Sequence, residues 1–461
     1  MAPAPSPINS QHVAVIGAGA AGLVAARELR REGHTVVVLD REKQVGGLWV
    51  YTPETESDEL GLDPTRPIVH SSVYESLRTN LPRECMGYKD FPFVPRGDDP
   101  SRDSRRYPSH REVLAYLQDF ATEFNIEEMI RFETEVVKVE PVNGKWRVQS
   151  KTAGGFSNDE IYDAVVVCCG HFAEPNIAQI PGIESWPGKQ THSHSYRVPD
   201  PFKDEVVVVI GNFASGADIS RDISKVAKEV HIASRASKSD TFEKRPVPNN
   251  NLWMHSEIDT AHEDGTIVFK NGKVVHADTI VHCTGYKYYF PFLETNDYMR
   301  VDDNRVEPLY KHIFPPALAP GLSFIGLPAM GLQFYMFEVQ SKWVSAVLSG
   351  RVTLPSVDEM MDDLKLSYET QEALGIPKRY THKLGKSQCE YLDWIADQCG
   401  FPHVEHWRDQ EVTRGYQRLS NQPETFRDEW DDDDLMEEAY EDFARQNLIS
   451  FHPSRFLESG R

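Results

Sequence analysis

The sequence predicts an α/β fold class, because a unit of strand, glycine-rich turn, helix and strand occurs twice, at residues 12–40 and 206–235. This order of elements is typical of a Rossmann-like domain that binds a dinucleotide. After Val357 the chain becomes polar and helical. We therefore expect two Rossmann-like dinucleotide-binding domains, the second inserted in the first, with a helical C-terminal region.

The first unit starts with an apolar, β-branched run at residues 12–16, and residues 23–31 and 35–39 predict its helix and second strand. In the turn, Gly17 permits a tight bend, Gly19 lets the backbone approach a pyrophosphate, and Gly22 lets the helix pack on the strand. Asp40 closes the second strand, where a carboxylate can accept hydrogen bonds from ribose hydroxyls. The cofactor-binding residues predicted here are Gly17, Ala18, Gly19, Ala20, Ala21, Gly22 and Asp40.

The second unit differs from the first where its second strand ends. Strands are expected at residues 206–210 and 230–233, with a helix at 217–227. Ser234 and Arg235 stand where the first unit has its acid, and they suit a 2′-phosphate rather than a free ribose. We infer FAD in the first site and NADPH in the second. The residues predicted to bind NADPH are Gly211, Asn212, Phe213, Ala214, Ser215, Gly216, Ser234 and Arg235.

Phe213 replaces the middle glycine of the second turn, so the pyrophosphate should sit differently there. The alternative is a degenerate second copy that binds nothing. Further apolar runs at residues 164–169, 279–283 and 323–328 predict strands, and residues 334–348 predict an apolar helix. That helix could direct its positive end at the flavin pyrimidine ring, or it could simply pack in the core.

These elements divide the chain into three parts. We expect the first part of the FAD-binding domain at residues 11–198, the NADPH-binding domain at 199–284, and the second part of the FAD domain with the helical C-terminal region at 285–461. The acidic residues 431–434 lack the alternating spacing of a calcium loop, which favours a solvated helix start with no role beyond cover. No other spacing predicts a metal site.

Composition restricts the partners and the compartment. The formal net charge of -22 disfavours nucleic acid and anionic membranes as partners. None of the six cysteines is spaced as a disulfide framework or a CxxC pair, which favours a reducing, cytoplasmic location. Residues 1–10 lack the features of a signal peptide, and no apolar run reaches the roughly 20 residues that span a bilayer.

The segment between the two units carries a specific motif. Trp186, Gly188, His192 and Tyr196 follow the spacing FxGxxxHxxxY, with Trp in place of Phe. This resembles the identifying motif of class B flavin-containing monooxygenases, and the match continues through Gly46, Gly47, Leu48 and Trp49 and through residues 284–286. The resemblance implies that Gly47, Leu48 and Trp49 also contact FAD. Membrane-bound animal relatives end in an apolar anchor, which residues 451–461 do not resemble.

Within this family the chain looks most similar to the plant S-oxygenases, through residues 74–80, 106–108, 212–216, 252–256, 282–286 and the acidic stretch around Trp430. The resemblance implies that NADPH reduces FAD, that O₂ forms a flavin C4a-hydroperoxide, and that a small-molecule thioether takes one oxygen to become a sulfoxide. By family position Asn80 is the catalytic candidate, in contact with flavin and NADP⁺. Without the family, an Asn at a loop end is more often a cap.

Two plant branches are candidates for the substrate. We place S-alk(en)yl-cysteines such as S-allyl-cysteine first and the methylthioalkyl side chains of glucosinolates second. Both substrates carry anionic groups, so we expect a cation near the pocket. Other soft sulfur or nitrogen nucleophiles, and a flavin redox sensor without turnover, stay open. A disulfide reductase would need a redox cysteine pair, and a Baeyer–Villiger enzyme would normally have Trp at position 196.

Overall fold

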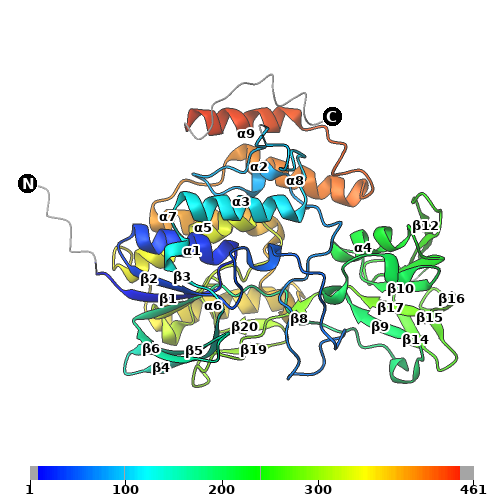
Figure 1. The fold of residues 1–461 in the computed structure, drawn as a ribbon, viewed down its shortest axis with the longest axis horizontal. Helices are drawn as coiled ribbons and strands as arrows, with labels where there is room; N and C mark the ends of the chain where they lie inside the picture. Colours follow the sequence, from blue (N-terminus) through cyan, green and yellow to red (C-terminus); the bar gives the residue numbers. More distant parts are fainter. Residues whose placement is uncertain (1–8, 98, 239, 447–461) are drawn as a thin grey trace, which may run out of the picture.

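The computed structural model describes residues 9–97, 99–238 and 240–446 and shows two lobes with a layer of helices above them (Figure 1). Residues 1–8 and 451–461, on which the expectations about a leader and an anchor largely rest, lie outside the described residues. The first lobe, drawn in blue, cyan and yellow, contains both the start of the chain and its later helices. The second lobe, drawn in green, is built from the middle of the sequence.

The first lobe is built around a parallel sheet with the strand order β21-β7-β1-β2-β3. The strands are β1 His12–Ile16, β2 Thr35–Leu39, β3 Ile130–Arg131, β7 Ala164–Val167 and β21 Leu322–Phe324. Helix α1, Ala20–Arg31, connects β1 to β2 and begins three residues earlier than residue 23, where we expected it. The last strand is shorter than the expected 323–328. The predicted β-α-β order is confirmed.

Both faces of this sheet are covered, which explains why its strands are apolar throughout. Helices α1, α3 (His110–Glu123) and α5 (Gln333–Leu348) pack on one face with Val13, Val15 and Val38. On the other face lies an antiparallel sheet of β4 Thr134–Val142, β5 Lys145–Thr152 and β6 Ser157–Tyr162. The carboxyl ends of β1, β2, β7 and β21 therefore form the open edge at which a ligand can bind.

The second lobe contains a six-stranded sheet in the order β12-β13-β11-β10-β17-β9. Its strands are β9 Lys189–His192, β10 Val206–Ile210, β11 Glu229–Ala233, β12 Phe242–Arg245, β13 Leu252–His255 and β17 Thr279–His282, and β12 alone among them is antiparallel to its neighbour. All of them fall between β7 and β21 in the sequence, so this lobe is inserted in the first. Because β9 joins the sheet, it starts before residue 199.

Helix α4, Ser215–Ile223, follows the second glycine turn and is shorter than the expected 217–227. The carbonyls of Ser224 and Ala227 accept hydrogen bonds from Asn251 Nδ2 at 3.0 and 2.9 Å. These side-chain bonds satisfy carbonyl groups that the end of the helix leaves free. A small sheet of β14 Ile258–Ala261, β15 Thr266–Phe269 and β16 Val274–His276 completes the lobe.

The chain enters and leaves the second lobe at one place. Strand β8, Glu174–Pro175, pairs antiparallel with β18, Tyr286–Lys287. The backbone N–H of Asn176 donates to the carbonyl of Gly285 at 3.0 Å. Strands β19 Arg300–Asp302 and β20 Arg305–Glu307 then form a hairpin in the first lobe.

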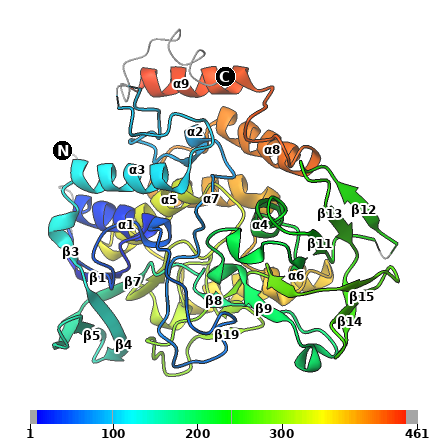
Figure 2. The same cartoon turned by 45° about the vertical axis from the view of Figure 1, so that its right-hand side comes forward.

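Helices α8 His406–Asn421 and α9 Asp433–Arg445 form the upper layer, and α8 extends toward the second lobe (Figures 1 and 2). The short helix α2, Arg83–Met86, packs against both of them. The two preceding helices lie lower: α7 Gln388–Cys399 packs against α5, and α6 Val357–Ala373 contacts residues 316–318. The expected solvated start of α9 is wrong for Asp432. This residue is completely buried, and its carboxylate lies 2.5 Å from both Arg106 and Arg418.

Candidate dinucleotide sites between the two lobes

The first glycine turn lies at the carboxyl end of β1, against the end of β7. Gly17 has φ +106°, and a Cβ atom there would lie 2.6 Å from the carbonyl oxygen of Cys168. A Cβ on Gly22 would lie 1.8 Å from the carbonyl oxygen of Gly17. Only glycine fits at both positions, because the turn, the helix and the neighbouring strand are in direct backbone contact.

The structure brings the second predicted glycine segment to the same place. Gly47 has φ +52°, and a Cβ on it would lie 2.9 Å from the Cα of Gly19. The N–H of Gly46 donates to the carbonyl of Ala18 at 3.1 Å. Among the described residues, no side chain caps the start of α1, whose N-cap is Gly19. The result is a backbone cradle beside free N–H groups, which fits the pyrophosphate of FAD.

Asp40 lies next to this cradle and contacts it directly. Its Oδ2 accepts a hydrogen bond from the N–H of Ala18 at 2.5 Å, and its Oδ1 accepts one from Glu42 at 2.7 Å. Burial raises the pKa of Asp40, although the two backbone hydrogen bonds oppose this shift. The carboxylate thus holds the turn in shape. Each oxygen has a second lone pair that can accept a ribose hydroxyl.

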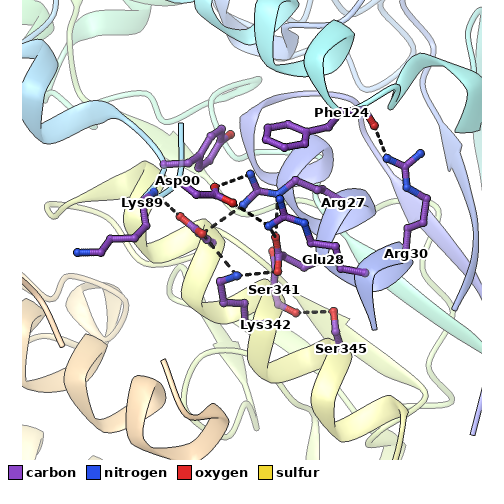
Figure 3. A network of polar contacts seen from close by, with 12 residues as sticks. Arg27, Glu28, Arg30, Lys89, Asp90, Phe124, Ser341, Lys342 and Ser345 are labelled. Carbon is purple, nitrogen blue, oxygen red and sulfur yellow. Dashed lines mark hydrogen bonds and ion pairs between the residues drawn. The ribbon is translucent and has the colours of Figure 1, made fainter. Parts of the chain in front are cut away.

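The position of α1, and with it the cradle, is fixed by a buried charge network (Figure 3). Arg27 of α1 donates to Glu28 at 2.7 Å, to Asp90 at 2.8 Å and to Glu338 of α5 at 3.2 Å. Lys342 of α5 reaches Glu28 at 2.7 Å. The polar residues of α5 therefore take part in packing. Gln340 accepts a hydrogen bond from the N–H of Gly326 at 2.9 Å, and Trp343 is buried. Orientation of the flavin by α5 stays a prediction.

The second turn repeats the geometry of the first. Gly211 has φ +109°, and a Cβ on it would lie 2.4 Å from the carbonyl oxygen of Cys283. A Cβ on Gly216 would lie 2.1 Å from the carbonyl oxygen of Gly211. Phe213, which replaces the middle glycine, is 57% exposed and so is not packed in the core. Ala214 takes the strained φ of +43°.

Ser234 and Arg235 follow β11 at the expected place beside this turn. Ser234 is buried and Arg235 is exposed, and Arg235 makes no hydrogen bond or ion pair within the described part of the chain. Arg235 interacts electrostatically with Tyr380. Burial would raise the pKa of Tyr380, but a hydrogen bond from Arg379 and the charges of Arg235 and Lys383 lower it. Sequence reasoning missed the cations at 379 and 383, because no local motif connects them to Arg235.

The motif segment, residues 186–196, lies in the second lobe and includes β9 of its sheet. A Cβ on Gly188 would lie 2.1 Å from the ring of Trp186, and the hydroxyl of Tyr196 donates to Asp222 at 2.7 Å. Nδ1 of His192 accepts from the N–H of His194 at 3.0 Å, and burial lowers the pKa of His192 to about 3. A histidine held neutral in this way supports structure rather than proton transfer.

Asn80 is exposed at the end of a loop that packs against α4. From this loop, the hydroxyls of Tyr74 and Ser76 donate to Asp218 and Asp222 at 3.1 and 2.8 Å. Since α4 begins within the second glycine turn, the loop places the catalytic candidate beside the predicted NADPH site. The side-chain oxygen Oδ1 of Asn80 accepts a hydrogen bond from Arg427 at 2.6 Å.

Comparison with known proteins identifies the family. A family model described as flavin-binding monooxygenase-like matches residues 10–241 and 247–404. The chain belongs to this family. Flavin-containing monooxygenase FMO GS-OX4 from Arabidopsis thaliana is 97% identical over 461 residues, which cover 100% of both chains. The solved structure of S-allyl-L-cysteine S-oxygenase from Allium sativum has 53% identity and a TM-score of 0.93, over 95% of this chain and 100% of that one.

Membership in the flavin-binding monooxygenase-like family confirms several expectations. The protein is an NADPH-dependent flavin-containing monooxygenase that uses FAD and acts on a small molecule with O₂. A steroid monooxygenase bound to NADP shares the fold at 18% identity and a TM-score of 0.56, over 85% of this chain and 98% of that one. Within residues 9–97, 99–238 and 240–446, no helix is long and apolar enough to cross a bilayer.

The cysteines of this flavin-containing monooxygenase lack the properties of a redox pair. Cys168 and Cys169 are adjacent, and burial raises the pKa of both thiols, that of Cys169 to about 12. Thiol exchange requires a thiolate, so these residues are poorly suited to disulfide reduction. All six cysteines are free.

Proposed function

We propose that this monooxygenase converts the methylthioalkyl side chain of a glucosinolate to its sulfoxide. The observation that supports this choice is the 97% identity to FMO GS-OX4, a member of the glucosinolate S-oxygenases. The sequence alone favoured S-alk(en)yl-cysteines. The garlic enzyme that acts on S-allyl-L-cysteine is only 53% identical, so we now rank that substrate second.

We propose the following roles for the residues of the two sites. The cradle of Gly17, Gly19 and Gly47 holds the FAD pyrophosphate, and Asp40 accepts a ribose hydroxyl. Gly211 and Gly216 shape the NADPH turn, where Arg235 faces the 2′-phosphate. Asn80 presents its amide between the two cofactors. Leu48 and Trp49, next to Gly47, and Asn212, Ala214 and Ser215, within the second turn, complete the expected contacts.

In the overall reaction, a thioether, O₂, NADPH and a proton are converted to a sulfoxide, water and NADP⁺. When bound, FAD supplies the activation of O₂ and the transfer of one oxygen atom to sulfur. A thioether sulfur is a neutral nucleophile with no proton to remove, so the substrate needs no side-chain base. The protein's task is then to position the sulfur, exclude water and donate hydrogen bonds. We place this reaction in the cytoplasm, where six free cysteines are compatible with the reducing conditions.

The test supplies the enzyme with NADPH and heavy-isotope O₂, together with either a methylthioalkyl glucosinolate or S-allyl-cysteine. Mass spectrometry then locates the heavy oxygen. We expect a labelled sulfoxide from the glucosinolate, formed with a higher kcat/KM than from S-allyl-cysteine. A higher kcat/KM for S-allyl-cysteine would reverse the proposed ranking of the two substrates. NADPH consumption that yields only hydrogen peroxide with both would exclude both.

A further inference from the structure

Residues 422–428, which connect α8 to α9, contact both lobes; we refer to them as the strap. Phe426 is buried and packs edge-on against Tyr107, with 5.8 Å between ring centroids. Asp428 pairs with Arg78 of the first lobe at 2.8 Å, and Glu424 pairs with Arg221 of α4 at 3.6 Å. The strap is therefore attached on both sides of the boundary between the lobes.

Arg427 lies at the centre of the strap and contacts the catalytic candidate. Its two terminal nitrogens donate to the carboxylate of Asp218 in α4 at 2.9 and 2.6 Å, as a bidentate pair. Nη2 also donates to Oδ1 of Asn80 at 2.6 Å, and Nε donates to the carbonyl of Thr79 at 2.9 Å. The side chains of Arg427 and Asp218 are only 14% and 15% exposed. A shielded, bidentate pair of this kind is both strong and geometrically specific.

These contacts determine how the amide of Asn80 is oriented. A guanidinium has donors only, so the carbonyl oxygen of Asn80 must face Arg427 and its NH₂ group must point away. Within the described chain, the Asn80 side chain has no other hydrogen bond. The same guanidinium holds Asp218, which lies in the first turn of the helix that starts at the NADPH turn. One side chain thus fixes both the amide direction and its separation from α4.

We propose that Arg427 is a positioning residue for oxygen transfer: it aims the NH₂ group of Asn80 toward the cofactors and fixes the first lobe against the NADPH helix. This inference rests on the proposed role of Asn80. It also gives the C-terminal region a function, since the sequence predicted no role there beyond cover. The strap takes no part in chemistry itself and acts through Asn80 and α4.

The experiment compares Arg427→Ala and Arg427→Lys with Asp428→Ala in the FAD-loaded enzyme. Asp428→Ala is the matched control, because it removes a strap ion pair that contacts neither Asn80 nor α4. Two quantities are measured: sulfoxide formed per NADPH consumed, and the Kd of NADP⁺ from the absorbance change of the oxidised flavin. We expect Arg427→Ala to lower the sulfoxide formed per NADPH about fivefold and to raise the Kd of NADP⁺ about tenfold. Asp428→Ala should change neither, and Arg427→Lys should be intermediate.

Asn80→Ala and the double variant separate the possible failures. If Arg427 acts through Asn80, Arg427→Ala adds little further loss of coupling in an Asn80→Ala background. Equal losses in Asp428→Ala and Arg427→Ala, or multiplied losses in the double variant, would overturn the proposal. An Asn80→Ala variant with unchanged coupling would instead remove the role of Asn80 itself. If Arg427→Ala does not fold, as judged by FAD content and Tm, Arg427→Lys and Asp218→Asn decide the question.

Discussion

Gly17 and Gly211 occupy equivalent positions, and the residues they face are equivalent too. Each has a positive φ, and each lies against a carbonyl oxygen at the end of the neighbouring parallel strand, that of Cys168 or Cys283. The spacing of the motif is enough to predict this, because the turn is determined by residues that are adjacent in sequence. Its requirement for glycine can be tested one site at a time.

Gly17→Ala is expected to abolish FAD retention. The new Cβ would meet the Cys168 carbonyl at 2.6 Å in a backbone conformation that alanine rarely adopts. Flavin absorbance per protein after purification measures the effect. Gly415→Ala is the control, because nothing lies within 4 Å of its added Cβ in helix α8. Full flavin content in Gly17→Ala would contradict the proposed cradle.

Arg235→Ala is expected to reduce the preference for NADPH over NADH. If Arg235 contacts the 2′-phosphate as proposed, loss of its guanidinium should lower the ratio of the two kcat/KM values about 10- to 100-fold, mostly through the KM of NADPH. Steady-state kinetics with both nucleotides provide the ratio. Lys228→Ala removes an exposed charge from the same lobe and should leave it unchanged. An unaltered ratio in Arg235→Ala would place the 2′-phosphate elsewhere.

At the scale of elements, the C-terminal helices depend on buried charges, some of whose partners lie far away in sequence. Helix α8 begins after Glu405. The carboxylate of Glu405 pairs with Lys89 and accepts a hydrogen bond from Nε of Arg408 at 2.8 Å. Burial alone would raise the pKa of Glu405, but the charges of Arg408 and Lys89 lower it to about 2. A carboxyl group with a depressed pKa stabilises the fold above its unfolded pKa, and this stability disappears as the pH falls through the folded pKa.

Glu405→Gln is expected to lower the free energy of unfolding by roughly 2 kcal/mol near neutral pH. The difference from wild type should shrink between about pH 4.5 and pH 2, since wild-type Glu405 becomes protonated over this range. Urea unfolding at several pH values provides both curves. Glu438→Gln, at an exposed position of α9, serves as the control. Parallel curves for wild type and Glu405→Gln would contradict the assigned shift.

At the scale of the whole molecule, the two β-α-β units, the main parallel strands and the insertion of one lobe in the other could be predicted from sequence. Those features follow from local apolar runs and glycine spacing. The joining of the lobes could not be predicted. Arg427 contacts residues 347 and 209 positions away, and the partner of Asp432 at 106 lies 326 positions away. A run of acidic residues is expected to be solvated when no basic partner is near in sequence. Asp432 was therefore wrongly predicted to be exposed, because its arginine partners are brought to it only by the fold.

The net charge of -22 makes a prediction for the whole molecule. A glucosinolate is an anion, so the protein's overall field should slow its approach at low salt. Raising the ionic strength from about 20 to about 200 mM should therefore increase kcat/KM for the glucosinolate about twofold, at saturating NADPH. An uncharged thioether measured in parallel should show no such rise. A fall for the glucosinolate would contradict this prediction and would indicate that cations near its binding site dominate its approach.

The pairing of β8 with β18 makes the second lobe separable in principle. The chain crosses into this lobe after Pro175 and returns at Tyr286, and these two residues are directly opposite each other. The residues between them form the second lobe, and the two ends of the first lobe meet at this point. A short linker could bridge the excision, and a lobe from a relative with another nucleotide preference could be grafted at the same two points. The crossing therefore marks natural breakpoints for building chimaeras.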